Sequence, residues 1–307
     1  MVRAKSTRPA PVKKKAAAKP VRRATQRKAK KKPQRQMPSW LRYVIAGLIA
    51  FLFLAAFFYF FIRPYSYRWK PCYGFKAYGV CMPSGFQVHG IDVSHYQGNI
   101  DWKMLTQTRQ GKFPIHFVFM KASEGGDYGD KAFITNFDSA KTHGFIRGAY
   151  HFYNPKTDPI RQADFFINSV KLDSGDLPPV LDIEKRGKDE NQLRRDLKLW
   201  LDKIEQHYKV KPILYTSYKF KTRYLNDSVF NSYPYWIAHY YVDSVEYIIM
   251  GYPVRIAHYY VDSVEYRGEW KFWQHTDVGT LPGIREKVDL NIFNGSLEEL
   301  QLMTIKK

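Results

Sequence analysis

The sequence has few cysteines, and its amino-terminal part has no acidic residue. Residues 1–43 hold 16 lysines and arginines without one aspartate or glutamate, whereas the rest of the 307 residues hold 33 basic and 28 acidic side chains. The net charge of +21 therefore belongs mostly to a tail that cannot bury an apolar core, and we expect residues 1–43 to be disordered. A solvated flank is the simpler interpretation of this tail. Contact with anionic lipid is the alternative, and we predict no specific nucleic-acid partner.

Charge of either sign is missing from the next segment, residues 44–62. This run of 19 residues, VIAGLIAFLFLAAFFYFFI, is long enough to cross a hydrocarbon core as a helix. A cleaved signal peptide is the competing interpretation, but the long basic region before the run and the lack of an obvious small-residue cleavage site disfavour it. We therefore predict a transmembrane signal anchor with a cytoplasmic amino terminus. Everything after about residue 64 then lies in the periplasm or outside the cell.

Cysteine is limited to Cys72 and Cys81, which follow the apolar run. In an oxidising compartment the two thiols can close a small loop and stiffen a stalk over residues 63–86, and two unpaired thiols are the alternative. No spacing typical of metal ligands is present, so the sequence predicts neither a metal nor a cofactor.

Residues 87–303 alternate apolar, strand-like runs with amphipathic, helix-like segments. The expected strands are 89–93, 116–121, 146–153, 179–184, 212–216, 235–240, 271–275 and 288–293, and the expected helices are 101–105, 131–143, 159–170, 191–207 and 297–300. Such alternation predicts an α/β fold with a parallel sheet covered on its faces. About eight strands and few helices in the second half favour an irregular (β/α) barrel of the TIM-barrel type. A doubly wound open sheet is the second possibility.

The strand at Pro179–Glu184 ends in two carboxylates, Asp182 and Glu184. Strand side chains alternate faces, so these two residues point the same way. Such a pair suits glycoside hydrolysis, in which one acid gives a proton and the other stabilises positive charge. A bare Asp-x-Glu is more often two acids facing solvent. Here, however, polar or aromatic residues also stand at the carboxyl ends of other strands, where α/β barrels build their active sites: Asp92, Lys121, Tyr150, Tyr215, His239 and Gln274.

One feature does not fit a regular barrel. Residues 237–247, IAHYYVDSVEY, recur without a mismatch at residues 256–266. A strand-sized unit that is present twice is a local duplication rather than a solenoid. Because Trp236 continues directly into the first copy, we expect that copy to supply the barrel strand and the second to form an outer hairpin or loop.

Seven short motifs follow one another in the barrel region: HGIDVS at 89–94, KASEG at 121–125, GAYHF at 148–152, VLDIE at 180–184, WIA at 236–238, WQ at 273–274 and VDLN at 288–291. In this order they resemble the glycoside hydrolase family 25 lysozymes, which are N-acetylmuramidases. Each motif is weak alone, but their order makes the resemblance specific. It implies an irregular β/α barrel, and the duplication departs from the family pattern beside Trp236.

The resemblance also implies roles for individual residues. Glu184 matches the family's acid/base and Asp182 the carboxylate beside it, while Asp92 and Asp289 match two further acids and Tyr150 a site tyrosine. Four carboxylates around one pocket repel one another, so at least one should keep its proton near neutral pH, as a general acid requires.

Other candidate residues have both a structural and a functional interpretation. Trp236 and Trp273 either belong to the core or stack on sugar, and Gln274 is expected to contact sugar. Lys121 and Glu124 are expected to form an ion pair that supports the cleft. His151 is expected to be a hydrogen-bonded supporting residue rather than a proton carrier.

These observations predict a lysozyme-type glycoside hydrolase that cleaves the β-1,4 bond between N-acetylmuramic acid and N-acetylglucosamine in peptidoglycan. The i, i+2 spacing of Asp182 and Glu184 is wider than the roughly 5 Å of a direct-nucleophile pair. It therefore favours a retaining mechanism assisted by the substrate's own acetamido group. The alternative function is a catalytically silent module that binds cell-wall glycan, although such a module does not need four acids.

Overall fold

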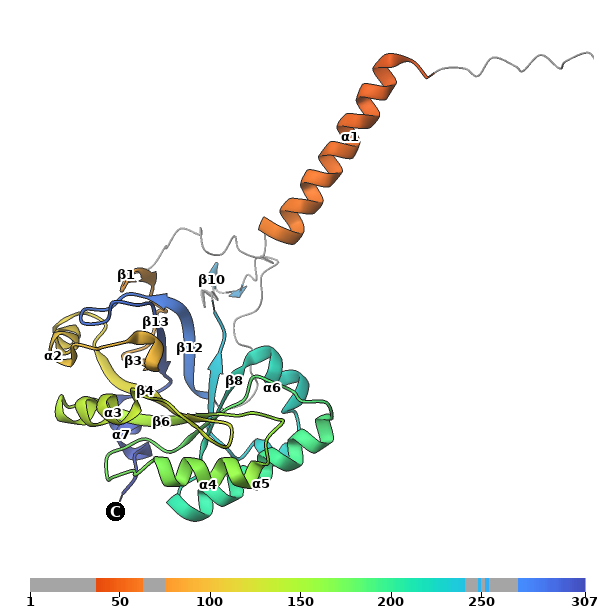
Figure 1. The fold of residues 1–307 in the computed structure, drawn as a ribbon. Coiled ribbons are helices and arrows are strands. Elements are labelled where there is room, and N and C mark those ends of the chain that lie inside the picture. Colours follow the sequence, from red (N-terminus) through yellow and green to blue (C-terminus); the bar gives the residue numbers. More distant parts are fainter. Residues whose placement is uncertain (1–36, 63–74, 241–247, 250–251, 254–269, 307) are drawn as a thin grey trace, which may run out of the picture. The chain divides into compact units, whose positions relative to one another are not determined.

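A computed structural model of the chain describes residues 37–62, 75–240, 248–249, 252–253 and 270–306 (Figure 1). The chain divides into two compact units, Met1–Pro64 and Tyr65–Lys307. Residues 1–36 of the predicted tail, Cys72 and the second copy of the repeat lie outside the described residues. What was predicted for them stays a prediction.

The first unit contains one long apolar helix. Helix α1 (Ser39–Phe57) follows Pro38 and continues as the π-helical turn η1 (Phe58–Ile62). The span begins before the uncharged run does and covers 24 residues. Its most apolar window of 18 residues has a mean hydropathy of 2.6 and is not buried inside the protein. By length and composition this helix can cross a membrane.

The second unit is built on a closed barrel of eight strands (Figure 1). They are β3 (Val88–Val93), β4 (Ile115–Glu124), β6 (Ile146–Phe152), β7 (Val180–Asp182), β8 (Ile213–Ser217), β9 (Tyr235–Ala238), β12 (Trp270–Gly279) and β13 (Val288–Phe293). Strands β3 to β12 run parallel, each to the next in this order. Strand β13 lies between β12 and β3 and is antiparallel to both, and the β3–β4 pairing closes the barrel.

This topology confirms the predicted mixed α/β barrel and excludes the open doubly wound sheet. The TIM-barrel label is too strict, because a TIM barrel has eight parallel strands and β13 is antiparallel. The antiparallel strand matters for function, since it brings its amino end, rather than its carboxyl end, to the rim where the other seven strands end.

The remaining elements are connections and covering helices (Figure 1). They are η3 (His95–Gln97), α2 (Trp102–Leu105), η4 (Thr106–Gln110), β5 (Tyr128–Gly129), α3 (Phe133–Thr142), α4 (Pro159–Ser169), α5 (Glu190–Tyr208), α6 (Tyr218–Tyr224), η5 (Ser228–Phe230) and α7 (Leu297–Met303). Asp158 and Asp189 accept hydrogen bonds from the first turns of α4 and α5, and Pro159 begins α4. These helices bury apolar faces, for example Leu197 and Trp200 of α5, which are fully buried.

The barrel interior follows the two-residue period of strands. One buried cluster fills it: Val88, Phe117, Phe119, Leu177, Val180, Ile213, Tyr215, Trp236, Phe272, Phe293 and Leu300. A Cβ atom on Gly90 would collide with the Phe117 ring, and one on Gly148 with the Phe119 ring. The two glycines therefore make room for the two phenylalanines in the crowded interior. Further along the same inward-facing sides of the strands, polar side chains follow this apolar cluster.

The segment before the barrel is part of the barrel unit rather than a free stalk. Strands β1 (Lys76–Ala77) and β2 (Val80–Cys81) form a hairpin, and Cys81 is disulfide-bonded. The chain's only other cysteine is Cys72, as the predicted loop requires. The Tyr78 hydroxyl donates to the carbonyl of Phe113 at 2.6 Å, and the Tyr78 carbonyl accepts from Thr280 at 2.8 Å. The predicted boundary at residue 87 therefore falls too late.

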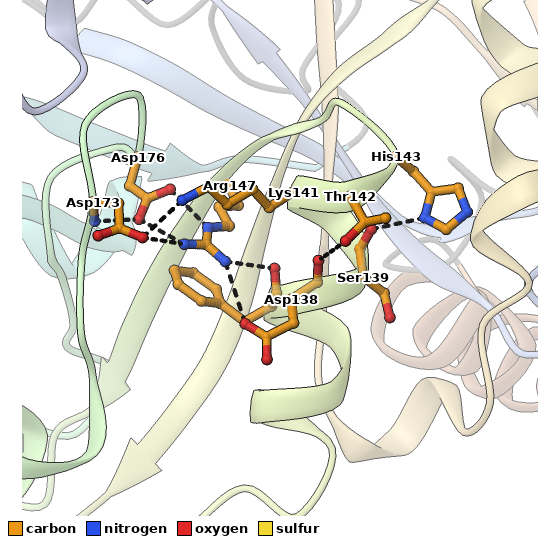
Figure 2. Close-up of polar contacts among 9 residues, drawn as sticks. Asp138, Ser139, Lys141, Thr142, His143, Arg147, Asp173 and Asp176 are labelled. Atoms are coloured by element: carbon orange, nitrogen blue, oxygen red, sulfur yellow. Dashed lines mark hydrogen bonds and ion pairs between the residues drawn. The ribbon is translucent and has the colours of Figure 1, made fainter.

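A buried ion pair ties β6 to neighbouring segments (Figure 2). The Arg147 guanidinium donates to both carboxylate oxygens of Asp176, at 2.7 and 3.1 Å, and to the carbonyl of Phe137 at 2.9 Å. The same guanidinium lies 3.8 Å from the centre of the Phe137 ring. Asp138 and Asp173 lie 3.6 Å from it as weaker partners. Arg147 thus joins β6, α3 and the turn after α4.

Most predicted elements agree with the structure to within a few residues, and the exceptions have physical causes. Strand β4 continues through the predicted loop at 122–124 because Ser123 and Glu124 pair with β5. Strand β9 begins at Tyr235 and contains Ile237 and Ala238, so the first copy of the repeat supplies barrel-strand residues as predicted. The spacer between the copies carries a short hairpin, β10 (Ile248–Ile249) with β11 (Tyr252–Pro253).

Candidate active site

Four acids from three strands meet at one rim of the barrel. Asp92 is the second-to-last residue of β3. Asp182 is the last residue of β7, and Glu184 lies two residues after it. Asp289 comes from the amino end of the antiparallel β13, where it is the register partner of Asp92. All four line one cavity of about 240 Å³. The structure therefore brings together the four carboxylates that the sequence singled out.

Gln274 of β12 connects two of these acids with two tyrosines through hydrogen bonds. Its Nε2 donates to Asp92 Oδ2 at 2.8 Å and to Asp289 Oδ2 at 3.0 Å. Its Oε1 accepts from the hydroxyls of Tyr215, at 2.7 Å, and Tyr240, at 2.6 Å. Gln274 is 1% exposed, so its amide is fully engaged with the protein. It holds two carboxylates in place rather than offering a free amide to a ligand.

Asp92 and Asp289 face each other across an antiparallel strand pair, where like charges destabilise one another. Burial raises the pKa of Asp92 to about 6, although hydrogen bonds from Asn291 and Gln274 oppose the shift. Burial and the charge of Asp92 raise the pKa of Asp289 to about 9. At neutral pH the pair therefore holds one proton, which the two coupled carboxyl groups share.

Asp182 and Glu184 differ in their access to solvent. Asp182 is 6% exposed, and its Oδ1 has no hydrogen-bond partner among the residues that the structure describes. Burial, with Glu184 and Asp92 adding negative charge nearby, raises its pKa well above the ordinary range. Glu184 is exposed at the rim. Desolvation raises the pKa of Glu184, whereas Lys185 and Lys121 lower it.

The other predicted contact residues separate into two groups. Tyr150 and Trp236 line the cavity with Gln274, and burial raises the pKa of Tyr150, so its hydroxyl stays a donor. The Trp236 ring stacks on Phe119 at 4.4 Å, and its Nε1 donates to Asn291. Trp273 does not line the cavity. It neighbours Gln274 on one strand, so it faces outward, where it packs beside Phe86.

The two predicted supporting interactions are confirmed. Lys121 donates to Glu124 at 2.6 Å, and Lys121 also lines the cavity. His151 is fully buried, with its Nδ1 2.8 Å from the Ser123 hydroxyl and its Nε2 3.2 Å from Gln162 Oε1. Burial lowers the pKa of His151 to about 4, so the ring is neutral at physiological pH.

Asn291 and Tyr240 were not singled out from the sequence, and Tyr215 was singled out only for its place at a strand end. Asn291 donates to Asp92 Oδ2 at 2.8 Å, and Tyr215 and Tyr240 orient Gln274. Asn291 stands two residues after Asp289 on a strand, so alternation alone could have found it. Tyr240 lies in the first copy of the repeat, two residues beyond the end of β9, although the strand expected at 235–240 included it.

Comparisons with known proteins agree with this geometry. The model of the glycosyl hydrolases family 25 matches residues 91–284. The chain is 36% identical over 236 residues to the protein YegX of Escherichia coli (strain K12), covering 76% of this chain and 79% of that one. It is 32% identical over 231 residues to "Lysozyme M1" of Streptomyces globisporus, covering 69% and 70%.

A solved structure shows the same fold. The family 25 glycosyl hydrolase from Bacillus anthracis matches with a TM-score of 0.61 at 28% identity, over 73% of this chain and 96% of that one. The matched family region begins within β3 and extends past β12, so it includes three of the four rim carboxylates, whereas Asp289 lies just beyond it. On this evidence the chain belongs to the glycosyl hydrolases family 25 and is a glycoside hydrolase.

Proposed function

We propose that this glycoside hydrolase is a muramidase, which cleaves the β-1,4 bond between N-acetylmuramic acid and N-acetylglucosamine in peptidoglycan. The observation that carries the proposal is the convergence of Asp182 and Glu184 on one cavity with Asp92 and Asp289. The name of the relative "Lysozyme M1" supports the choice of substrate. The cavity offers carboxylates and hydroxyls, the groups that protonate and orient a glycoside.

Glu184 is the proposed acid/base. It is the most accessible of the four carboxylates, and desolvation raises its pKa above the ordinary range, in the direction that a general acid needs. In the first step Glu184 gives its proton to the glycosidic oxygen as the bond to the anomeric carbon breaks. In the second step the same carboxylate, now ionised, takes a proton from the attacking water.

Asp182 is proposed to act on the substrate's acetamido group. Its unpartnered Oδ1 is an acceptor that lacks a donor, and an acetamido N–H supplies one. The acetamido oxygen, polarised in this way, attacks the anomeric carbon and gives a cyclic intermediate that water opens with net retention. A buried carboxyl with a strongly raised pKa is a poor direct nucleophile, which supports the assisted route.

Asp92 and Asp289 are proposed to balance charge. The negative charge of this pair stabilises the positive charge that develops on the sugar ring, while the proton that the pair holds limits repulsion within the pocket. Gln274 and Asn291 hold Asp92 in place, so no reorganisation is needed during the reaction.

The experiment digests purified peptidoglycan with the full-length chain in detergent and identifies the new reducing-end sugar by mass spectrometry. Muramic acid at that end supports the proposal. Glucosamine at that end overturns the bond assignment, and binding without cleavage supports the silent glycan-binding module instead.

We further propose that α1 anchors the barrel unit on the outer side of a membrane. The 24-residue apolar span and the acid-free basic segment before it support this orientation. Alkaline phosphatase fused after Lys307 should be active, and green fluorescent protein fused there should be dark. The opposite pattern would place the barrel in the cytoplasm.

A further inference from the structure

Two tyrosines of the barrel unit stand out by their exposure. Among the described residues of that unit, Tyr96 at 74% and Tyr128 at 42% are the exposed tyrosines. Both belong to segments that follow the carboxyl ends of β3 and β4, and Tyr96 lines the acidic cavity together with Gln97. The Tyr96 side chain leaves about three quarters of its surface in solvent at the mouth of the cavity. Packing in the core therefore does not explain why a large aromatic residue stands at this position.

The backbone that carries Tyr96 is held firmly. The Ser94 hydroxyl accepts from the Tyr96 amide at 3.3 Å, and the Gln97 side chain accepts from the Ser94 amide at 2.8 Å. Gln97 Nε2 in turn donates to the carbonyl of Lys287 at 3.0 Å, which ties the turn η3 to the segment before β13. The exposed ring therefore stands on a fixed turn rather than on a free loop.

The ring itself is also supported. Its centre lies 4.2 Å from that of the His95 ring, at an angle of 33°. Asp130, whose side chain is fully buried, accepts from His95 Nδ1 at 2.7 Å and from the His95 amide at 3.0 Å. One face of the Tyr96 ring therefore packs against the His95 ring, which the buried Asp130 carboxylate holds in place. The rest of the Tyr96 surface is open to a ligand.

The position of Tyr96 relative to Glu184 fits a chain-like ligand. Around the barrel, β3 and β7 are separated by β4 and β6, so the two residues rise from well-separated parts of the rim. Both line the same cavity. A polymer whose scissile bond lies at Glu184 and whose chain crosses the cavity passes Tyr96 with a neighbouring unit.

We propose that the Tyr96 ring is a stacking platform for a pyranose of the glycan strand, next to the sugar pair that is cleaved. This inference rests on the proposed function. A sugar ring has an apolar C–H face that covers an aromatic ring and polar edges that the amide of Gln97 can meet. A nucleotide or other anion does not fit, because the cavity is lined by four carboxylates.

The test measures binding separately from cleavage. The full-length chain carrying Glu184→Gln is sedimented with purified cell-wall sacculi over a range of protein concentrations. Adding Tyr96→Ala should weaken binding about tenfold, the scale of one aromatic stacking contact. Tyr96→Phe should bind within twofold, because the ring and not the hydroxyl makes the contact. Leu302→Ala, which removes an apolar side chain that is 66% exposed on α7, is the matched control and should also bind within twofold.

In the active chain, Tyr96→Ala should raise KM on soluble glycan strands several-fold more than it lowers kcat. Equal affinity with and without the ring, or a loss confined to kcat, overturns the platform. A wild-type chain that yields no muramic acid overturns the proposed function instead. A wild-type chain that cleaves while its Glu184→Gln form binds sacculi equally well with Tyr96 or Ala removes the platform and leaves the muramidase standing.

Discussion

The barrel unit carries two groups of carboxylates, each with a buried centre, and the surroundings of the two groups are opposite in kind. Around Arg147, the Asp176 carboxylate meets a guanidinium in a two-pronged contact, with Asp138 and Asp173 close by (Figure 2). In the cavity, Asp92, Asp182 and Asp289 form no ion pair with any described residue. The side-chain amides of Gln274 and Asn291 donate to Asp92, and that of Gln274 also donates to Asp289.

The difference separates structure from chemistry. A carboxylate that arginine contacts through two parallel hydrogen bonds is held in one position, so it joins neighbouring segments of the fold. A carboxylate that is buried among other carboxylates holds its proton near neutral pH, which costs stability and provides reactivity. Each prediction below changes one side of this comparison.

The largest effect is expected from removing the proposed proton donor. Glu184→Gln should lower the rate of glycan cleavage by at least about 10³-fold, because the amide cannot give a proton to the leaving oxygen. The free energy of unfolding should change by less than about 0.5 kcal/mol, since Glu184 is exposed. Release of reducing ends and thermal unfolding measure the two quantities.

Glu190→Gln, at the exposed start of α5, is the control for that experiment and should cleave within twofold of the wild type. Full activity of the Glu184→Gln protein would remove Glu184 from the acid/base role and leave Asp182 as the remaining candidate.

On the structural side, Arg147→Met should destabilise the fold and spare the chemistry. It leaves Asp176 buried without its cation, which costs about 3–5 kcal/mol. Activity per folded molecule should stay within about twofold at a temperature well below the unfolding midpoint. Urea unfolding gives the stability, and a specific loss of activity in fully folded protein would show that the two carboxylate groups are coupled.

The contrast between the two groups was only partly readable from the sequence. Alternation and strand ends located Asp92, Asp182 and Glu184, because a strand fixes which side chains share a face, whereas Asp289 was located only by the resemblance to the family. The same rule turns Trp273 away from the barrel interior once its neighbour Gln274 faces the interior. The resemblance, in which the two residues form one motif, drew attention away from this consequence. The closing strand β13 was expected, but its direction depends on how residues 280–287 turn, which no local pattern specifies.

The long-range partners were the other gap. Arg147 and Asp176 lie 29 residues apart and carry no motif, so their bidentate contact depends on packing of the finished barrel. Likewise, Gln274 reaches Asp92 across 182 residues of sequence, and Tyr240 lies past the end of a strand. Propensity locates elements, but it does not say which polar groups their packing brings into contact.

A smaller effect is expected from replacing Asp289 of the acidic pair with a residue that cannot ionise. The pKa of Asp289 is about 9 in the folded protein and about 3.9 in the unfolded chain. Between those values the folded state binds more protons, so its stability falls as the pH rises through this window. Asp289→Asn removes this slope, so the variant should gain stability over the wild type as the pH rises from 6 to 8, with no gain at pH 4.

Unfolding in urea at pH 4, 6 and 8 checks this prediction, with Asp127→Asn as the control because its side chain is 82% exposed. A gain of equal size at all three pH values would mean that packing, rather than the trapped proton, limits stability at this position.

The smallest effect tests whether proximity alone makes an ion pair matter. Lys141 lies 2.7 Å from Asp173, as close as the shortest contact of Arg147, but both side chains are about half exposed. Water screens the exposed pair, so Lys141→Ala should cost less than about 0.5–1 kcal/mol and leave cleavage unchanged. If urea unfolding instead shows a loss near that of Arg147→Met, then Lys141 supports the network in Figure 2 through Asp173. In that case a half-exposed ion pair would also stabilise the fold, and burial alone would not identify the carboxylates that do so.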